Sequence, residues 1–307
     1  DTTTTTTVPS SSPVQIQLKL ALAALIVQTS SKLWPDPVAD LFMFANQNSQ
    51  KISNVLDVLA MIPEQLSNKS IQFSSNDLYY QKCALLLEGH IDDLIQMVLK
   101  VLQNTNDDRL RVSKDLLACL LAWIQFGGNG SKIIESPEFM NGLFVLLYSN
   151  CTKVIAVQEE DDDEEDHLQV IEIACELLVE LIIRMSGRIE DWDDNQTGPE
   201  TSANSNRFGD DWFLQLANQW IPCLSTNLCQ LPLIQSLQLH KESLLRPLLT
   251  LLCESLELFL SQLMERKEEF KILSETVLAV SEFSFSASST NSSSLIPSSI
   301  LELTFNF

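Results

Sequence analysis

The sequence predicts an all-α fold in which antiparallel helix pairs stack into a solenoid. Apolar residues recur with helical spacing in QLKLALAALIVQ (residues 17–28), NVLDVLAMIPEQL (54–66) and KDLLACLLAWIQFG (114–127). The 307-residue chain is 45% hydrophobic and has only 8 glycines, which favours helix over sheet. Polar breaks separate these segments into helix–turn–helix units of roughly 40–50 residues, a period that is typical of HEAT repeats.

The helices can be placed in order from their start and stop signals. The first is expected over residues 14–30, directly after Pro13, and Pro35 and Pro37 form the turn that follows. Asp36 is placed to cap the next helix. The helices after this turn are expected over residues 38–48, 51–66, 77–104, 107–127, 137–148, 167–186, 209–224, 231–265 and 267–281.

Prolines and glycines inside these segments predict where helices bend or end. Pro63 should end or kink the third helix, and Pro247 should interrupt the helix over 231–265. Gly89 should kink the long segment after residue 77, and Gly127 with Gly128 should stop a helix.

Polar insertions divide the chain further. The expected organisation is a disordered Thr/Ser-rich linker (1–13), a solenoid (14–283) with an acidic loop (156–166) and a polar loop (188–207), a disordered Ser-rich insertion (284–299), and the start of another helix (300–307). A solenoid tolerates such insertions because each repeat contacts only its neighbours.

The charge balance restricts the kind of partner. Asp and Glu number 41 against 19 Lys and Arg, a net charge of −22. This argues against direct binding of nucleic-acid phosphates and of anionic membranes, and it favours a basic protein partner. The alternative is that the charge serves only to keep the protein in solution. Seven cysteines without a CxxC motif indicate a reducing compartment, the cytosol or nucleus.

Motifs of catalysis and metal binding are absent from the sequence. There is no GxSxG motif for a serine nucleophile and no HExxH motif for zinc. His90, His167 and His240 lie far apart, and GGNG (127–130) follows a helix rather than a strand. We therefore expect no enzyme activity, no cofactor and no metal site, although His167 beside the acidic run could bind a metal weakly. No apolar run has the roughly 18–20 residues of a membrane span.

Two acidic clusters are the candidate partner-binding residues. The first is an unbroken run: Glu159, Glu160, Asp161, Asp162, Asp163, Glu164, Glu165 and Asp166. The second surrounds an aromatic ring that could stack on arginine: Asp191, Trp192, Asp193 and Asp194. Dense like charge is relieved by a cationic partner. The alternative for both clusters is a solvated charge run with no ligand.

Five segments together resemble the importin-β superfamily of nuclear transport receptors, specifically its transportin-SR and importin-thirteen branch. They are QLKLALAALIVQ (17–28), VLDVLAMIPEQLSNKSI (55–71), LLACLLAWIQFG (116–127), LLCESLELFL (251–260) and SILELTFNF (299–307). Pro63 with Glu64 resembles the leucine-rich LP-E-E segment of that branch, whereas Gln65 departs from its second acid. The resemblance implies an internal piece of a receptor that lacks about two repeats before residue 1 and most of the solenoid after residue 307.

The resemblance also implies partners and a location. These are the GTPase Ran, a basic or Arg/Ser-rich protein cargo, and nucleoporin FG repeats, in a protein that shuttles between cytoplasm and nucleus. Import is the expected direction of transport, with export as the alternative. Phe side chains of FG repeats would insert into hollows between neighbouring helices. The alternative is a HEAT or armadillo scaffold unrelated to transport, such as a phosphatase regulatory subunit.

Overall fold

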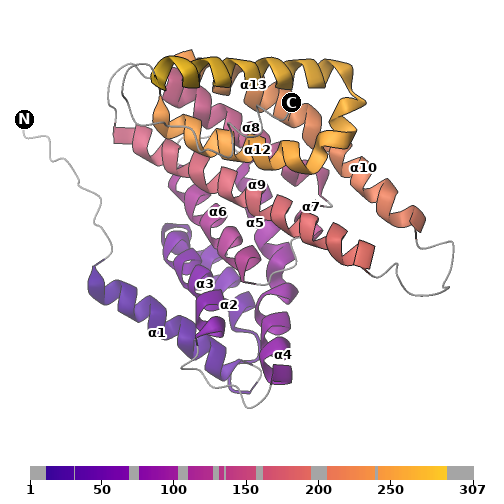
Figure 1. The fold of residues 1–307 in the computed structure, drawn as a ribbon. Coiled ribbons are helices and arrows are strands. Elements are labelled where there is room, and N and C mark those ends of the chain that lie inside the picture. Colours follow the sequence, from indigo (N-terminus) through magenta and orange to yellow (C-terminus); the bar gives the residue numbers. More distant parts are fainter. Residues whose placement is uncertain are drawn as a thin grey trace, which may run out of the picture. The chain divides into compact units, whose positions relative to one another are not determined.

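The structure, a computed structural model, confirms the all-α fold class (Figure 1). It describes residues 12–30, 32–68, 76–102, 110–126, 131–134, 136–156, 162–194, 206–238 and 241–288. Within these ranges the helices are accompanied by one isolated β-bridge, between Ser30 and Trp34, and by no strand. The chain divides into two compact units, one formed by residues 1–94 with 118–129 and the other by residues 95–117 with 130–307.

In the first unit, α3 (Ile52–Ser67) packs against the helix two before it in the chain and against both of its chain neighbours. The elements of this unit are α1 (Pro13–Thr29), α2 (Pro37–Gln47), η1 (Ser49–Lys51), α3 (Ile52–Ser67), α4 (Asn76–Leu86), η2 (Glu88–His90), the start of α5 (Ile91–Leu102) and the second half of α6 (Leu110–Gln125). α3 packs against α1, α2 and α4. Ser12 caps α1 through a capping box with Gln15, and Asp36 caps α2 as expected.

Pro63 does not end α3, which continues to Ser67. A proline lacks the N–H that would bond to the carbonyl four residues earlier, here that of Leu59. The indole Nε1 of Trp123 donates a hydrogen bond to this carbonyl oxygen at 2.8 Å. Both Leu59 and Trp123 are fully buried. A side chain from α6 therefore supplies the donor that Pro63 removes, which explains why the helix is not interrupted.

A buried lysine holds the C-terminal end of α1. The Nζ of Lys82 donates to the carbonyl oxygens of Val27 (2.5 Å) and Ser30 (3.0 Å) and to Ser30 Oγ (2.8 Å). A cation is favourable there because the last carbonyls of a helix carry partial negative charge. Burial, and to a smaller extent the charge of Lys32, lower the pKa of Lys82.

The second unit repeats this arrangement with longer helices. Its elements are the rest of α5 and α6, then α7 (Ser131–Ile134), α8 (Pro137–Ala156), α9 (Asp162–Asp194), α10 (Asn206–Cys223), the π-helix η5 (Leu224–Leu233), α11 (Ile234–Gln238), α12 (Glu242–Met264) and α13 (Lys267–Ser288). α9 packs against α8 and α12, whereas η5 packs against α8, α10, α12 and α13 (Figure 1). Helices separated along the chain therefore form the rows expected of stacked pairs.

An aromatic cluster joins these rows. The Trp220 ring lies 5.5 Å from the Phe144 ring, edge to face, and 5.8 Å from the Phe259 ring. Phe213 stacks on Phe259 with ring centroids 5.5 Å apart. The indole Nε1 of Trp220 donates to Ser255 Oγ at 3.1 Å. Helices α8, α10 and α12 thus share one core.

The two expected loops are partly helical. α9 begins at Asp162, so the last five residues of the acidic loop expected over 156–166 lie in its first turns, where acidic residues suit the helix dipole. α9 also continues to Asp194 and α10 begins at Asn206, so both ends of the polar loop expected over 188–207 are helical. Residues 157–161 and 195–205 lie outside the described residues.

The other boundaries differ in smaller ways. The expected kink at Gly89 is present, because α4 ends at Leu86 and η2 precedes α5. Pro247 does not interrupt α12. α8 is longer than expected, and α13 extends to Ser288, five residues into the expected insertion over 284–299. Residues 1–11, 127–130 and 289–307, with the expected linker, helix stop and last helix, lie outside the described part.

Candidate protein-interaction surfaces

The structure places the second predicted acidic cluster and the last five residues of the first on one helix, α9, at its two ends. Asp162, Asp163, Asp191, Trp192, Asp193 and Asp194 lie in α9, with side chains outside the described set, and Glu159, Glu160 and Asp161 are also outside it. From Asp166 to Asp191 a straight helix spans about 40 Å. The two clusters are therefore separate sites. Side-chain contacts are described for three of their residues, Glu164, Glu165 and Asp166.

Two of these three carboxylates already contact a lysine of the same unit. Glu164 Oε1 lies 3.0 Å from Lys241 Nζ, which also donates to the carbonyl oxygen of Val154, at the end of α8, at 2.6 Å. Asp166 Oδ1 lies 2.9 Å from Lys114 Nζ. These lysines connect the start of α9 to its neighbours. A basic partner that bound Glu164 or Asp166 would have to compete with them.

Glu165 is the most accessible carboxylate of the three. Its side chain is exposed, and its Oε1 accepts a hydrogen bond from Gln169 Nε2 at 3.2 Å. Gln169 in turn accepts a bond from Lys114 at 2.9 Å. Since Glu165 contacts an amide rather than a cation, its negative charge is the most open to a partner among the three carboxylates described here.

His167, considered above as a weak metal ligand, is a buried core residue. Its Nδ1 lies 2.7 Å from Asn150 Oδ1, and both residues are buried between α8 and α9. No group of three or more His, Cys, Asp or Glu side chains that could hold a metal ion occurs among the described residues. The structure thus gives this histidine a packing and hydrogen-bonding role.

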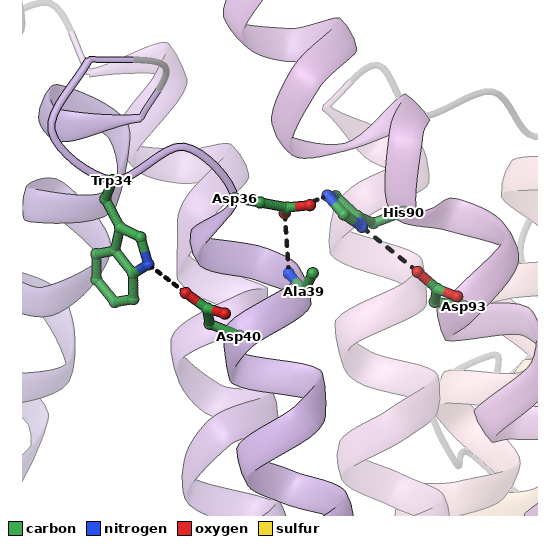
Figure 2. A network of polar contacts seen from close by, with 6 residues as sticks. All are labelled: Trp34, Asp36, Ala39, Asp40, His90 and Asp93. Carbon is green, nitrogen blue, oxygen red and sulfur yellow. Dashed lines mark hydrogen bonds and ion pairs between the residues drawn. The ribbon is translucent and has the colours of Figure 1, made fainter.

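A second polar network lies in the first unit, around the turn before α2 (Figure 2). The Nε2 of His90 lies 3.0 Å from Asp36 Oδ1, and its Nδ1 lies 3.4 Å from Asp93 Oδ2. The same Asp36 oxygen accepts the capping bond from the Ala39 amide at 3.1 Å. Asp36 therefore connects the start of α2 to η2 and α5.

Trp34 belongs to the same surface. Its indole Nε1 donates to Asp40 Oδ2 at 2.7 Å, which holds the ring against the first turns of α2 (Figure 2). The sequence analysis identified Asp36 as a cap from its position before Pro37, but it gave no role to Trp34, Asp40 or Asp93. The acidic residues here are spread over 58 positions of the chain, so no local motif could identify them.

The cysteine thiols pack among other side chains and are not activated as nucleophiles. Burial raises the pKa of Cys151 and of Cys229 to about 12 and that of Cys253 to about 11. Burial also raises the pKa of Cys83, Cys175 and Cys223. These six thiols are therefore protonated near neutral pH and are poor nucleophiles.

Among the residues that the structure describes, one helix, α8, is long and apolar enough to cross a membrane by length and composition. Its buried residues recur at three- and four-residue intervals and face the core of the second unit: Phe139, Met140, Leu143, Phe144, Leu147, Asn150, Cys151 and Val154. Such burial is typical of a core helix.

Comparison with known proteins relates the chain to one family. Residues 11–159, just under half of the chain, match the model of the exportin 1-like protein family (Xpo1). The match begins just before α1 and ends beyond α8. No curated protein and no solved structure matches. The family match supports a relation to the importin-β superfamily, and thus to transport receptors rather than enzymes, without selecting a branch of it.

Proposed function

We propose that this chain is a segment of a nuclear transport receptor of the transportin-SR type. The receptor would bind protein cargo and, in the intact protein, Ran-GTP and nucleoporin FG repeats. The observation that carries the proposal is the match of residues 11–159 to the exportin 1-like family, which supports a karyopherin-type receptor in general. The all-α architecture, with rows of stacked helices in each unit, agrees with this function.

The mechanism follows from the properties of helical repeats. Each repeat contacts only its neighbours, so small rotations between repeats add up to a change of curvature. If Ran-GTP and cargo prefer different curvatures, each lowers the affinity for the other by the same factor. For an importer, cargo binds in the cytoplasm and Ran-GTP releases it in the nucleus.

The acidic residues of α9 are the proposed contacts for a basic or Arg/Ser-rich cargo. They are Asp162, Asp163, Glu164, Glu165 and Asp166 at its start and the cluster around Trp192 at its end. Glu159, Glu160 and Asp161, which precede the helix in the sequence, are included in the proposal. Glu165 supports this proposal because it is exposed and contacts no lysine in the geometry described above. Glu164 and Asp166 would exchange Lys241 and Lys114 for cations of the partner, a step that costs little between partly exposed charges.

Two alternatives stay open. Export is favoured by the description of the matching family, which names an exportin. A protein-interaction scaffold without a role in transport is compatible with the same stacked helices.

One experiment separates the three functions. The intact protein is immobilised, and its bound proteins are identified with Ran-GTP, with Ran-GDP and without Ran. Release of bound proteins by Ran-GTP alone indicates import, and their retention only with Ran-GTP indicates export. If Ran-GTP neither binds nor changes the bound proteins, the transport function is wrong and the scaffold is favoured.

A further inference from the structure

We propose that α2 and the turn before it form a docking surface for a basic protein segment that also carries apolar side chains. The surface, called here the α2 surface, consists of Leu33, Trp34, Met43 and Phe44. It lies apart in sequence from the acidic residues of α9, and the inference applies whether or not the protein is a transport receptor.

The first observation is exposed apolar area. Leu33 is 84% exposed, Met43 58% and Phe44 43%, and Trp34 is partly exposed. These four large side chains fall within twelve consecutive residues. Single exposed apolar residues are ordinary, but a group of them is a feature of interaction sites.

The second observation is that Met43 and Phe44 share one side of α2 with Asp40, which holds Trp34. Met43 and Phe44 follow Asp40 by three and four residues, which places all three on the same side of the helix. The Trp34 indole is hydrogen-bonded to Asp40 at 2.7 Å and so lies at the beginning of this side (Figure 2). Trp34, Met43 and Phe44 thus form a stripe along one side of α2, with Asp40 between Trp34 and the other two, and Leu33 precedes the stripe in the turn.

The third observation is that the turn is held in place by several bonds. The backbone N–H groups of Lys32, Leu33 and Trp34 all donate to the carbonyl oxygen of Thr29, at 3.2, 3.0 and 3.1 Å. Asp36, at the end of the turn, caps α2 and contacts His90. An exposed side chain on an ordered turn loses little entropy when it binds, so Leu33 is a suitable anchor.

Charge selects the occupant. Carboxylates of Asp36 and Asp40 border the apolar stripe, and both residues are exposed. The Phe44 ring already has a cation over its face, because Lys51 Nζ lies 5.9 Å from the ring centroid. Arginine in a partner could form the same contact with Trp34 while it pairs with the carboxylates. A segment of mixed arginine and leucine, phenylalanine or methionine therefore fits, with its arginines at Asp36 and Asp40 and its apolar side chains toward Leu33 and Phe44, beside Lys32 and Lys51.

The test measures binding of three fluorescent synthetic peptides to the 307-residue chain by anisotropy. The first peptide alternates arginine and leucine, the second has serine in place of arginine, and the third has serine in place of leucine. We expect the first to bind most tightly. The double substitution Leu33→Ser/Met43→Ser should weaken this binding about tenfold, which corresponds to about 1.4 kcal/mol.

Two further variants complete the design. Leu278→Ser, on α13, removes a leucine that is 62% exposed and should leave the affinity within about twofold of wild type. Asp40→Asn, which keeps an acceptor for Trp34, should weaken binding of the first peptide about threefold and reduce its dependence on salt. Circular dichroism verifies that each variant is folded.

The outcomes distinguish the parts of the inference. Equal binding of the first peptide to wild type and to Leu33→Ser/Met43→Ser would show that the α2 surface is not the site. Equal binding of the serine-for-arginine peptide would contradict the basic chemistry, and equal binding of the serine-for-leucine peptide would contradict the apolar anchor. Since Ran is not used, failure of the transport function has no bearing on these results.

Discussion

α3 in the first unit and the start of α9 in the second are both held by polar side chains from distant parts of the chain, but in different surroundings. At α3 the Trp123–Leu59 bond is fully buried, and nearby Lys82 is buried against the end of α1. At α9 the pair of Lys241 and Glu164 keeps about a fifth of each side chain exposed. Water can replace the partly exposed contact of Lys241 with Glu164, but it cannot reach the buried bond between Trp123 and Leu59. Stability should therefore depend on the contacts of α3, and a partner should find replaceable charges at α9.

The largest expected effect follows removal of the Trp123 indole, which lies in α6 and donates a hydrogen bond to α3. Trp123→Phe leaves the buried Leu59 carbonyl without a partner, because Pro63 offers no N–H. The loss should lower the free energy of unfolding by about 2 kcal/mol, measured by urea denaturation.

Pro63→Ala provides the matched control for this prediction. The substitution restores the backbone N–H four residues after Leu59, so Trp123→Phe should cost about 1 kcal/mol less in that background. Additive effects of the two substitutions would contradict the idea that Trp123 compensates for Pro63. They would assign its cost to packing against Phe42, whose ring lies 6.5 Å away.

A smaller effect is expected at the start of α9. Lys241→Met removes the contacts with Glu164 and with the Val154 carbonyl, both partly exposed, and should cost about 1 kcal/mol. Lys114→Met is the matched variant, because its contacts with Asp166 and Gln169 involve side chains only, and should cost about 0.5 kcal/mol. Both costs are measured by thermal and urea unfolding at low and high salt. A cost at α9 that exceeds that of Trp123→Phe would reverse the comparison between the two regions.

The sequence was sufficient to predict most of the helices and the cap of α2. Helical periodicity identified nearly all of them, and Asp36 was recognised as a cap from its position before Pro37. These features depend on residues within a few positions of one another, which is the range over which local preferences act.

The contacts between residues that are distant in the chain could not be predicted from the sequence. Pro63 predicted a helix end or a kink, but its spacing could not identify Trp123, 60 positions later, as the residue that supplies the missing donor. The acidic run predicted a loop, but Lys241 and Lys114 neutralise its last residues and α9 begins inside it. Only the folded chain brings these partners together, so the accessible charge at Glu165 and the α2 surface could not be read from spacing.

The smallest expected effect concerns the pH dependence of the first unit. Burial lowers the pKa of Lys82 in the folded chain below its ordinary value of 10.5, so the unfolded chain binds more protons at this site in the window between the two values. The contribution of Lys82 to the free energy of unfolding is constant at pH values below both pKa values. It rises with pH between the folded and the unfolded pKa. The difference in unfolding free energy between wild type and Lys82→Met, measured by urea denaturation in steps up to pH 10.5, should therefore shift in favour of wild type as the pH rises. Lys32→Met removes the second cause of the lowered pKa and should narrow the window. A shift in the opposite direction would show that the three oxygen acceptors around Nζ outweigh burial and raise the pKa of Lys82 instead.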